Sequence, residues 1–434
     1  MRAAMSPGPR TRADLFTYRG LEVSGATLRA HYRLDEIDFT ETVTFEGCGD
    51  LDDAAVALAQ LWYLVAGLSY FKAGAARRVD LGDTPVGVAG HALLEASLHD
   101  GLGEFSVVNH LPLEDVEVVG GAPARHHVLD LDARRLLVPF GGGIDSVVSV
   151  EELDPSLERT LFIVSPSGAR FDALEETAAA TGLGVVRASR SLDARLLAGG
   201  AEFFNGHVPV TAMVTLLAGV AAVATRRGGV VMSNEHSASV PNLTWRGRPI
   251  NHQWSKSLVA EILLADAIDE VVSPLVVASL LRARSELWVA QRFSRLERYH
   301  HVFRSCNRAF AQDPSRRAPT WCNECDKCLF IDLVLAPFLE REALASIFHG
   351  EPLADPARRA QLEALVGLGD TPKPFECVGD PDESGAALRA VAASPAWRDV
   401  THLADVAARV SPNATLSDLL APQGPDRVPA HWLR

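Results

Sequence analysis

Residues 13–46 alternate between hydrophobic and polar positions, which is typical of half-buried β-strands. The segments FTYRGLEV, TLRAHYRL and DFTETVTFEG are also rich in β-branched and aromatic residues, and a glycine lies between the first two. Residues 51–75 then place apolar side chains at helical spacing, and Asp52 or Asp53 is suited to cap the first turn. These patterns predict an N-terminal α+β domain over residues 1–125.

From residue 134 onward, short apolar strand patterns alternate with helical patterns. RRLLVPF, RTLFIVSP, LGVVRAS and RGGVVMS predict four strands, and ARFDALEETAAATG predicts a helix that ends at Gly182. This order predicts an α/β domain over residues 126–275, with a parallel sheet and helices on both faces. Ligands of such sheets bind at the carboxyl ends of the strands. Residues 276–434 read as a helical region with Pro-rich breaks and a Cys cluster.

Residues 203–225 contain no Asp, Glu, Lys or Arg and are long enough to span a bilayer. The segment is rich in Ala and carries Asn205, His207 and Pro209, so a buried helix of the α/β domain is the better interpretation. The first residues lack the apolar core of a signal peptide. We therefore expect a cytoplasmic protein without a membrane partner. The net charge of −14 also argues weakly against a nucleic-acid partner, and no obligate protein partner is evident.

A run of three glycines follows the first strand of the α/β domain, in the sequence FGGGIDS. Glycines let backbone N–H groups approach an anion, and the helix that follows adds unpaired donors. A first-turn Ser can donate to a phosphate oxygen, and a first-turn Asp suits a Mg²⁺ ion held between phosphates. The alternative is a flexible glycine turn in which the Asp caps the helix. The candidate residues for ATP and Mg²⁺ are Gly141, Gly142, Gly143, Asp145 and Ser146, with Ser165 after the next strand.

The GGGIDS loop resembles the S-G-G-x-D-S fingerprint of the PP-loop ATP pyrophosphatases. Gly141 replaces the first Ser of that fingerprint, which removes one hydroxyl contact but leaves the backbone donors. The resemblance implies that ATP is split into AMP and pyrophosphate while a carboxylate, an amide or a similar oxygen is adenylated.

A polar segment, residues 233–264, follows the fourth strand; it is dense in Asn, His, Ser and Arg and then becomes a helix. At the carboxyl edge of the sheet such side chains can bind a polar substrate or move protons, although a solvated loop of turn-forming residues would look similar. The acid/base candidates are His236, His252 and Lys256, and the substrate-binding candidates are Asn234, Glu235 and Asn251. Arg supplies nearly all the basic residues, and Lys occurs only at positions 72, 256, 327 and 373. A retained Lys is weak evidence that a compact ammonium is needed there.

Four of the six cysteines cluster at Cys306, Cys322, Cys325 and Cys328, whereas Cys48 and Cys377 stand alone. Four thiolates in this spacing suit tetrahedral Zn²⁺. An iron–sulfur cluster and a metal-free set of thiols remain alternatives. We expect a structural zinc site that holds the helical region against the sheet.

The whole chain resembles the bacterial UDP-N-acetyl-α-D-muramoyl-L-alanyl-L-glutamate epimerases. The resemblance rests on YRGLEVSGATLRAHYRLDEIDFTETVTF, LVAGLSYFKA, FGGGIDS, SNEHSAS, INHQWSKSL, WCNECDKCLFIDLVLAPFL and KPFECVGD. It implies that ATP adenylates the α-carboxylate of the terminal L-Glu of UDP-MurNAc-L-Ala-L-Glu. Proton removal and return on the other face would then give the D-Glu isomer used in peptidoglycan.

Other activities remain open from the sequence. A deazaguanine nitrile synthase, an amidotransferase-type synthetase and a tRNA thiolase are alternatives within the PP-loop enzymes. A tRNA enzyme should show a basic stripe and an amide-forming enzyme an ammonia source, and neither is visible in the composition. A non-catalytic, zinc-stapled nucleotide-binding protein is the alternative from another class, and Gly141 is its best support.

Overall fold

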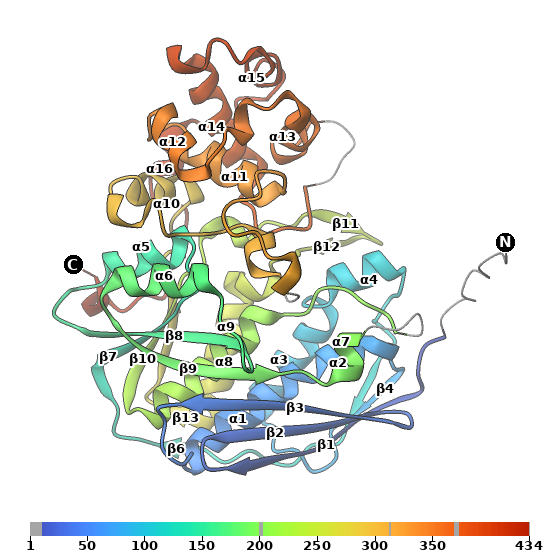
Figure 1. Cartoon of the computed structure of the whole chain (residues 1–434). Helices are drawn as coiled ribbons and strands as arrows, with labels where there is room; N and C mark the ends of the chain where they lie inside the picture. The colour runs from blue at the N-terminus through green and yellow to red at the C-terminus, as the bar shows by residue number, and fades with distance from the viewer. Residues whose placement is uncertain (1–10, 199–202, 312–313, 369–372, 434) are drawn as a thin grey trace.

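Ten strands form a single mixed sheet in the computed structural model, which describes residues 11–198, 203–311, 314–368 and 373–433 (Figure 1). Their order across the sheet is β14-β10-β7-β8-β9-β3-β2-β1-β4-β5. The strands are β1 (Leu15–Ser24), β2 (Thr27–Leu34), β3 (Ile37–Glu46), β4 (Arg78–Asp80), β5 (Glu117–Val119), β7 (Asp132–Pro139), β8 (Glu158–Pro166), β9 (Gly184–Ser191), β10 (Arg227–Met232) and β14 (Val276–Ser279). Two short pairs lie outside this sheet: β6 (His127–Val128) with β13 (Val272–Ser273), and β11 (Leu243–Trp245) with β12 (Arg248–Ile250).

The strands from β14 to β9 all run parallel, which confirms the predicted α/β fold class. Consecutive buried residues face opposite sides: Leu137 packs into one hydrophobic core, and Leu136 and Val138 pack into the other. Helices therefore cover both faces, as expected for buried parallel strands. The helices of this half are α5 (Ile144–Glu152), α6 (Asp172–Thr181), α7 (Ala194–Ala198), α8 (Val210–Ala224) and α9 (Leu258–Val271). Helix α6 ends at Gly182 with φ 70°, as its sequence predicts.

The N-terminal strands continue the same sheet, because β3 pairs with β9 in antiparallel register. Helix α1 (Asp53–Ala66) begins at Asp52, whose side chain accepts a hydrogen bond from the Ala55 N–H at 2.9 Å. The other helices of this region are α2 (Leu68–Gly74), α3 (Val88–His99) and α4 (Gly103–Asn109). The boundary near residue 125 stays a prediction.

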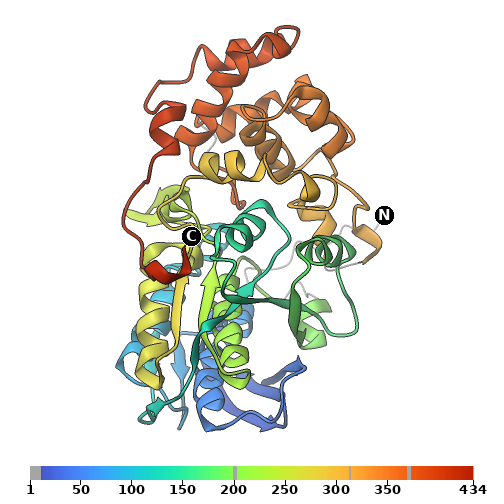
Figure 2. The ribbon, with the colours of Figure 1, turned by 90° about the vertical axis from the view of Figure 1, so that its left-hand side faces the viewer.

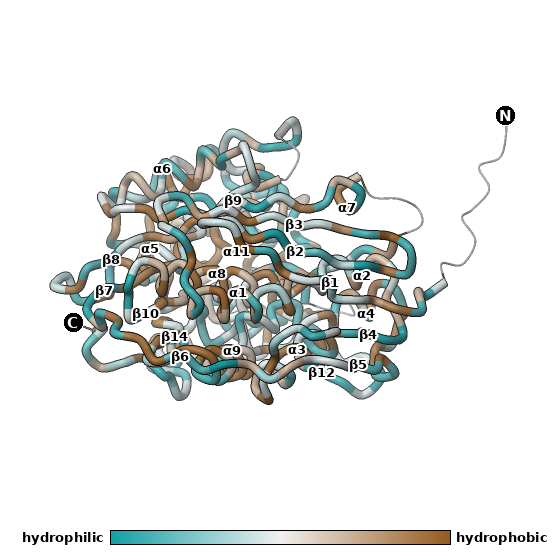
Figure 3. The backbone as a smooth tube through the Cα atoms, turned by 90° about the horizontal axis from the view of Figure 1, so that it is seen from below, coloured by the Kyte–Doolittle hydropathy of each residue, from teal (hydrophilic) through white to brown (hydrophobic). Residues whose placement is uncertain are grey.

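Helices α1 and α2 together, residues 53–74, form the one span in the described part of the chain that is long and apolar enough to cross a membrane. However, 83% of its most apolar window is buried inside the protein. The uncharged segment 203–225 contains α8, which is also buried and packs against α1. Figure 3 shows α1 and α8 together in the middle of the molecule, as expected of core helices.

The C-terminal helices lie above the carboxyl ends of the parallel strands (Figures 1 and 2). They are α10 (Glu286–Phe293), α11 (Asp326–Leu335), α12 (Arg341–Phe348), α13 (Arg359–Leu365), α14 (Pro381–Ala393), α15 (Thr401–Ala407) and α16 (Leu416–Leu420). Residues 276–434, which we expected to be a helical region, also contain the edge strand β14. The chain then returns to the sheet, where Leu433 pairs with Leu153 and Trp432 is buried. We refer to residues 286–420 as the helical layer.

A buried ion pair joins the two halves of the sheet and gives a stability prediction. Arg190 on β9 lies 2.5 Å from the fully buried carboxylate of Glu41 on β3. Arg190→Met removes the cation and leaves Glu41 buried without it, so we expect a loss of about 3 kcal/mol of unfolding free energy. Denaturant unfolding measures this loss.

Arg33→Met is the matched control, because the Arg33–Asp38 pair is exposed on the same meander. Arg33→Met should lower the unfolding free energy far less than Arg190→Met does. Equal losses from the two variants would contradict a special role for the buried pair.

Candidate active site

A cavity of about 470 Å³ lies between the carboxyl ends of β7, β8 and β10 and the helical layer. One wall comes from the glycine loop, and the facing wall comes from residues about 160 to 235 positions further along the chain. The structure thus places several predicted site residues together, as the edge rule for parallel sheets requires. The predicted residues that line the cavity are Gly141, Gly143, Asp145, Ser146, Asn234 and Lys256, and the distant wall includes Arg304, Ser305, Asn307, Lys327 and Cys377.

The glycine loop has the geometry of an anion cradle. Gly142 has φ 74°, which favours glycine, and a side chain at Gly143 would come within 2.7 Å of the Ser305 hydroxyl oxygen. A side chain at Gly141 would meet no atom within 4 Å, so the position of the missing Ser is open space. Gly143 is the N-cap of α5 and provides no side-chain cap, which leaves first-turn N–H groups unpaired by such a cap.

Asp145 is therefore not the cap of α5, in contrast to the alternative considered from the sequence. Ser146 donates its hydroxyl to the Gly143 carbonyl oxygen at 3.1 Å. That hydrogen bond must rearrange if the hydroxyl is to reach a phosphate.

Three carboxylates converge beside the loop. Oxygen atoms of Asp145, Glu235 and Glu286 lie within 4.8 Å of one another. Each of these side chains has one buried oxygen without a hydrogen-bond partner among the described residues. Burial, followed by the charge of Glu235, raises the pKa of Asp145 to about 6, and burial together with Asp145 raises the pKa of Glu286. Such clustered, unsatisfied oxygens fit a hard cation such as Mg²⁺.

Of these three carboxylates, the sequence singled out Asp145 for Mg²⁺ and Glu235 for substrate binding. Glu235 lies beside Asp145 and its substrate role stays a prediction, whereas Glu286 was not among the predicted site residues. The missing signal is understandable, because Ser285 caps α10 and Glu286 reads as an ordinary first-turn acid.

Lysines offset this negative charge. Lys256 and Lys327 line the cavity, and Lys373 is buried with an ammonium that has no hydrogen-bond partner among the described residues. Burial lowers the pKa of Lys373, while the surrounding carboxylates, Glu235 among them, oppose the change. For Lys256, burial would lower the pKa, but Cys377 and the three carboxylates raise it above its ordinary value.

Cys377, which the sequence left without a role, lies in this cavity beside Lys256. It hydrogen-bonds His252, which is itself bonded to Glu104 and lies against His207, with ring centroids 4.2 Å apart and ring planes 42° apart. His252 does not line the cavity and lies next to Cys377. Glu104 and His207 had no distinguishing sequence signal, because each lies in a segment whose pattern is explained by helix or core packing.

A second group of predicted residues lies elsewhere. His236 and Asn251 line a separate, mostly apolar cavity of about 620 Å³, next to Trp254 and Asp100. Ser165 lines two smaller cavities near β8 and β9, and its hydroxyl has no partner among the described residues. These three residues are therefore not brought to the cavity of the glycine loop, and their roles stay predictions.

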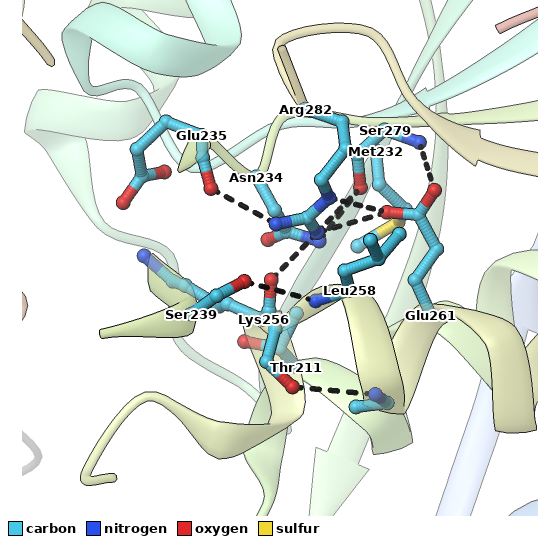
Figure 4. Close-up of polar contacts among 12 residues, drawn as sticks. Thr211, Met232, Asn234, Glu235, Ser239, Lys256, Leu258, Glu261, Ser279 and Arg282 are labelled. Carbon is cyan, nitrogen blue, oxygen red and sulfur yellow. Dashed lines mark hydrogen bonds and ion pairs between the residues drawn. The ribbon is translucent and has the colours of Figure 1, made fainter. Parts of the chain in front are cut away.

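Arg282 holds the polar loop, residues 233–257, through hydrogen bonds to its backbone (Figure 4). Its guanidinium donates to the Glu235 carbonyl oxygen at 2.9 Å and to the Lys256 carbonyl oxygen at 2.6 Å, and it pairs with Glu261 at 2.8 Å. Asn234 donates to the Ser279 hydroxyl at 2.9 Å. Glu235 and Lys256 are thus held at their backbones.

The four clustered cysteines lie together at the start of α11, with every pair of sulfur atoms within 4.8 Å. The Sγ of Cys328 lies 3.4 Å from that of Cys325 and 3.8 Å from that of Cys322. Cys306 completes the group from sixteen residues upstream of Cys322. Four convergent sulfurs fit a tetrahedral metal. Lys327 is between two of them in sequence, so the same turn presents an ammonium to the cavity.

Two family models match the chain. One, described as the MurL N-terminal domain, matches residues 9–276, and the other, the MurL C-terminal domain, matches residues 302–420. No solved structure matches.

Three relatives are named UDP-N-acetyl-alpha-D-muramoyl-L-alanyl-L-glutamate epimerase. The protein of Micromonospora sp. is 41% identical and the match covers 98% of both chains. The protein of Salinispora tropica is 38% identical over 97% of this chain and 95% of the relative, and that of Xanthomonas oryzae pv. oryzae is 34% identical over 92% and 90%. The chain therefore belongs to the family of UDP-N-acetyl-α-D-muramoyl-L-alanyl-L-glutamate epimerases.

Proposed function

We propose that this chain converts the terminal L-Glu of UDP-MurNAc-L-Ala-L-Glu to D-Glu, through an acyl-adenylate, with release of AMP and pyrophosphate. The observation that carries the proposal is that the glycine loop, Asp145 and two lysines line one cavity at the N-terminus of α5, which has no side-chain cap. Glu235 and Glu286 place carboxylate oxygens within 4.8 Å of that of Asp145. That set of groups suits a metal-bound polyphosphate. The relatives' name supplies the substrate.

Adenylation solves a chemical problem of this epimerisation. Removing the α-proton next to a free carboxylate would create a dianion, which is strongly unfavourable. An acyl-adenylate carries no charge on that carbonyl, so its α-proton is far more acidic. Proton removal on one face and return on the other then invert the centre, and water releases AMP.

The residues divide into binding groups by charge. The backbone of Gly141–Gly143 and the first turn of α5 would bind phosphate oxygens, and Lys256 and Lys327 would balance their charge. Asp145, Glu235 and Glu286 would hold Mg²⁺, which neutralises phosphate charge when bound. The open space at Gly141 is compatible with backbone binding without the usual hydroxyl. The PP-loop relationship is part of this proposal.

The four clustered cysteines would hold Zn²⁺ as a structural ion that takes no part in the reaction. By ordering the turn before α11, the ion would fix the helical layer and Lys327 over the sheet. We place the reaction in the cytoplasm, with the nucleotide-linked dipeptide as the partner and no nucleic acid or membrane.

The direct test incubates the protein with Mg-ATP and UDP-MurNAc-L-Ala-L-Glu. The product is then hydrolysed, and its glutamate is analysed on a chiral column. We expect D-Glu that depends on ATP and appears with AMP and pyrophosphate. Pyrophosphate without D-Glu would indicate another adenylating enzyme, and neither product from folded, metal-replete protein would favour a nucleotide-binding protein without catalysis.

Asp145→Asn tests the metal-phosphate site. We expect pyrophosphate release to fall by about 100-fold or more, because one charged ligand is lost. The thermal midpoint should move by less than about 2 °C, because Gly143 and not Asp145 caps α5. Asp172→Asn, an exposed first-turn acid on α6, is the matched control and should change neither quantity. A large loss of stability in Asp145→Asn alone would support a structural role instead.

Cys328→Ser tests the zinc site. We expect metal analysis to find about one zinc per wild-type chain, and this content should be lost in the variant together with several degrees of thermal stability. Cys48→Ser is the control, since Cys48 lies outside the cluster. Wild-type protein without zinc would contradict the assignment, and iron with visible absorbance would point to an iron–sulfur cluster.

A further inference from the structure

We propose that Cys377 is a catalytic acid/base, whose sulfur exchanges a proton with Cα of the activated glutamyl residue on one of its two faces. This inference rests on the proposed function and assigns a residue to a step that the function requires. The sulfur lies on the wall of the glycine-loop cavity, opposite the strand ends. An adenylated substrate bound at the loop would therefore have its α-carbon in the same enclosed space.

The segment that carries Cys377 is held on both sides of the thiol. Asn242 donates its side-chain amide to the Pro374 carbonyl oxygen at 2.8 Å, and the buried Gln253 donates to the Val378 carbonyl oxygen at 3.0 Å. Both donors belong to the polar loop, so the loop that holds Lys256 also positions Cys377. A fixed acid/base group is what proton transfer at carbon requires.

Cationic groups surround the sulfur. Lys256, Lys327 and the hydrogen-bonded His252 all face Cys377. Burial alone would raise the pKa of the thiol, but Lys256, His252 and Lys327 outweigh burial and lower it to about 7. A thiol and a thiolate are then both populated at neutral pH, which suits a group that must take and give a proton.

The groups behind His252 keep it charged. Burial would lower the pKa of His252, but its hydrogen bonds with Cys377 and Glu104 raise it to about 9. Burial, followed by the charge of His252, lowers the pKa of the neighbouring His207 to about 4, so His207 stays neutral. Lys72, which donates to the Gly206 carbonyl oxygen at 2.7 Å, is a further cation near Glu104. The neutral His207 and the contact with Glu104 therefore favour the imidazolium beside the sulfur.

The step balances without any further reactant. The Cys377 thiolate forms an S–H bond as the Cα–H bond breaks, and the electron pair of that bond passes into the enolate of the acyl-adenylate. A proton from the ammonium group of Lys256, which also lines the cavity, then forms the new Cα–H bond on the other face. Solvent restores both groups to their starting protonation states.

The test compares wild type, Cys377→Ser and Cys377→Ala in D₂O, with Cys48→Ser as a matched control. Each protein is incubated with Mg-ATP and one form of the substrate, and the L-Glu and the D-Glu forms are tested in separate reactions. Pyrophosphate release, deuterium uptake at Cα and inversion are measured on the same samples. The wild-type reactions test the proposed function by itself: if wild type does not adenylate or invert the substrate, that function is refuted. The comparison of the variants with an active wild type tests the role of Cys377.

We expect both Cys377 variants to invert at least about 100-fold more slowly than wild type. Pyrophosphate release should stay within a few-fold of the wild-type rate. Deuterium uptake at Cα should be lost with one substrate isomer and retained with the other. For the affected isomer, wild-type exchange should fall as the pH drops through about 7, because the thiolate is protonated there, and Cys377→Ser should lack this limb. Inversion within ten-fold of wild type, equal loss from both isomers, or a parallel loss of pyrophosphate release would each overturn the proposal.

Discussion

The buried pair between Arg282 and Glu261 is the interaction on which the polar side of the cavity depends. The two side chains are 1% and 3% exposed, and the guanidinium also binds the carbonyl oxygens of Glu235 and Lys256. Glu261 accepts in addition from the Ser279 backbone N–H on β14 at 3.2 Å. A buried ion pair offsets its desolvation cost only when its remaining donors and acceptors are satisfied, and here they are satisfied by the backbone of the site itself. The edge strand, the polar loop and helix α9 are thus fixed by one network (Figure 4).

The parts of the fold that the sequence predicts are those with a local cause. The glycine loop, the end of α6 at Gly182 and the cap at Asp52 each depend on residues within a few positions. Strand β14 was missed because Val276–Ser279 is a four-residue apolar run, which cannot be distinguished from a helix segment by its period. The β3–β9 pairing joins segments about 145 residues apart, and no local pattern encodes such a register.

The candidate site follows the same division. Asp145 and Lys256 lie on motifs at strand ends, so their convergence could be expected. Cys377 reaches the cavity, and Glu286 reaches the Asp145 carboxylate, only through the packing of the helical layer. Glu104 and His207 lie beside His252 only through the packing of the N-terminal half. The rarity of Lys was a real but weak signal: Lys256, Lys327 and Lys373 surround the carboxylates, and Lys72 lies beside the Glu104 cluster. The positions of the four Lys residues along the sequence do not by themselves distinguish functional residues from four lysines placed at random.

The arrangement also explains why the cavity needs both walls. The strand edge alone offers anion-binding backbone and the carboxylate of Asp145, whose pKa is raised by burial and then by the charge of Glu235. The helical layer adds Lys327 and Cys377, and the four cysteines meet at the start of its helix α11. Ammonium groups brought in this way oppose the carboxylate charge in a desolvated space, where electrostatic interactions are stronger than in water. In the proposed function, a cavity assembled from two distant parts of the chain would couple the binding of a polyphosphate on one wall to the proton chemistry available on the other.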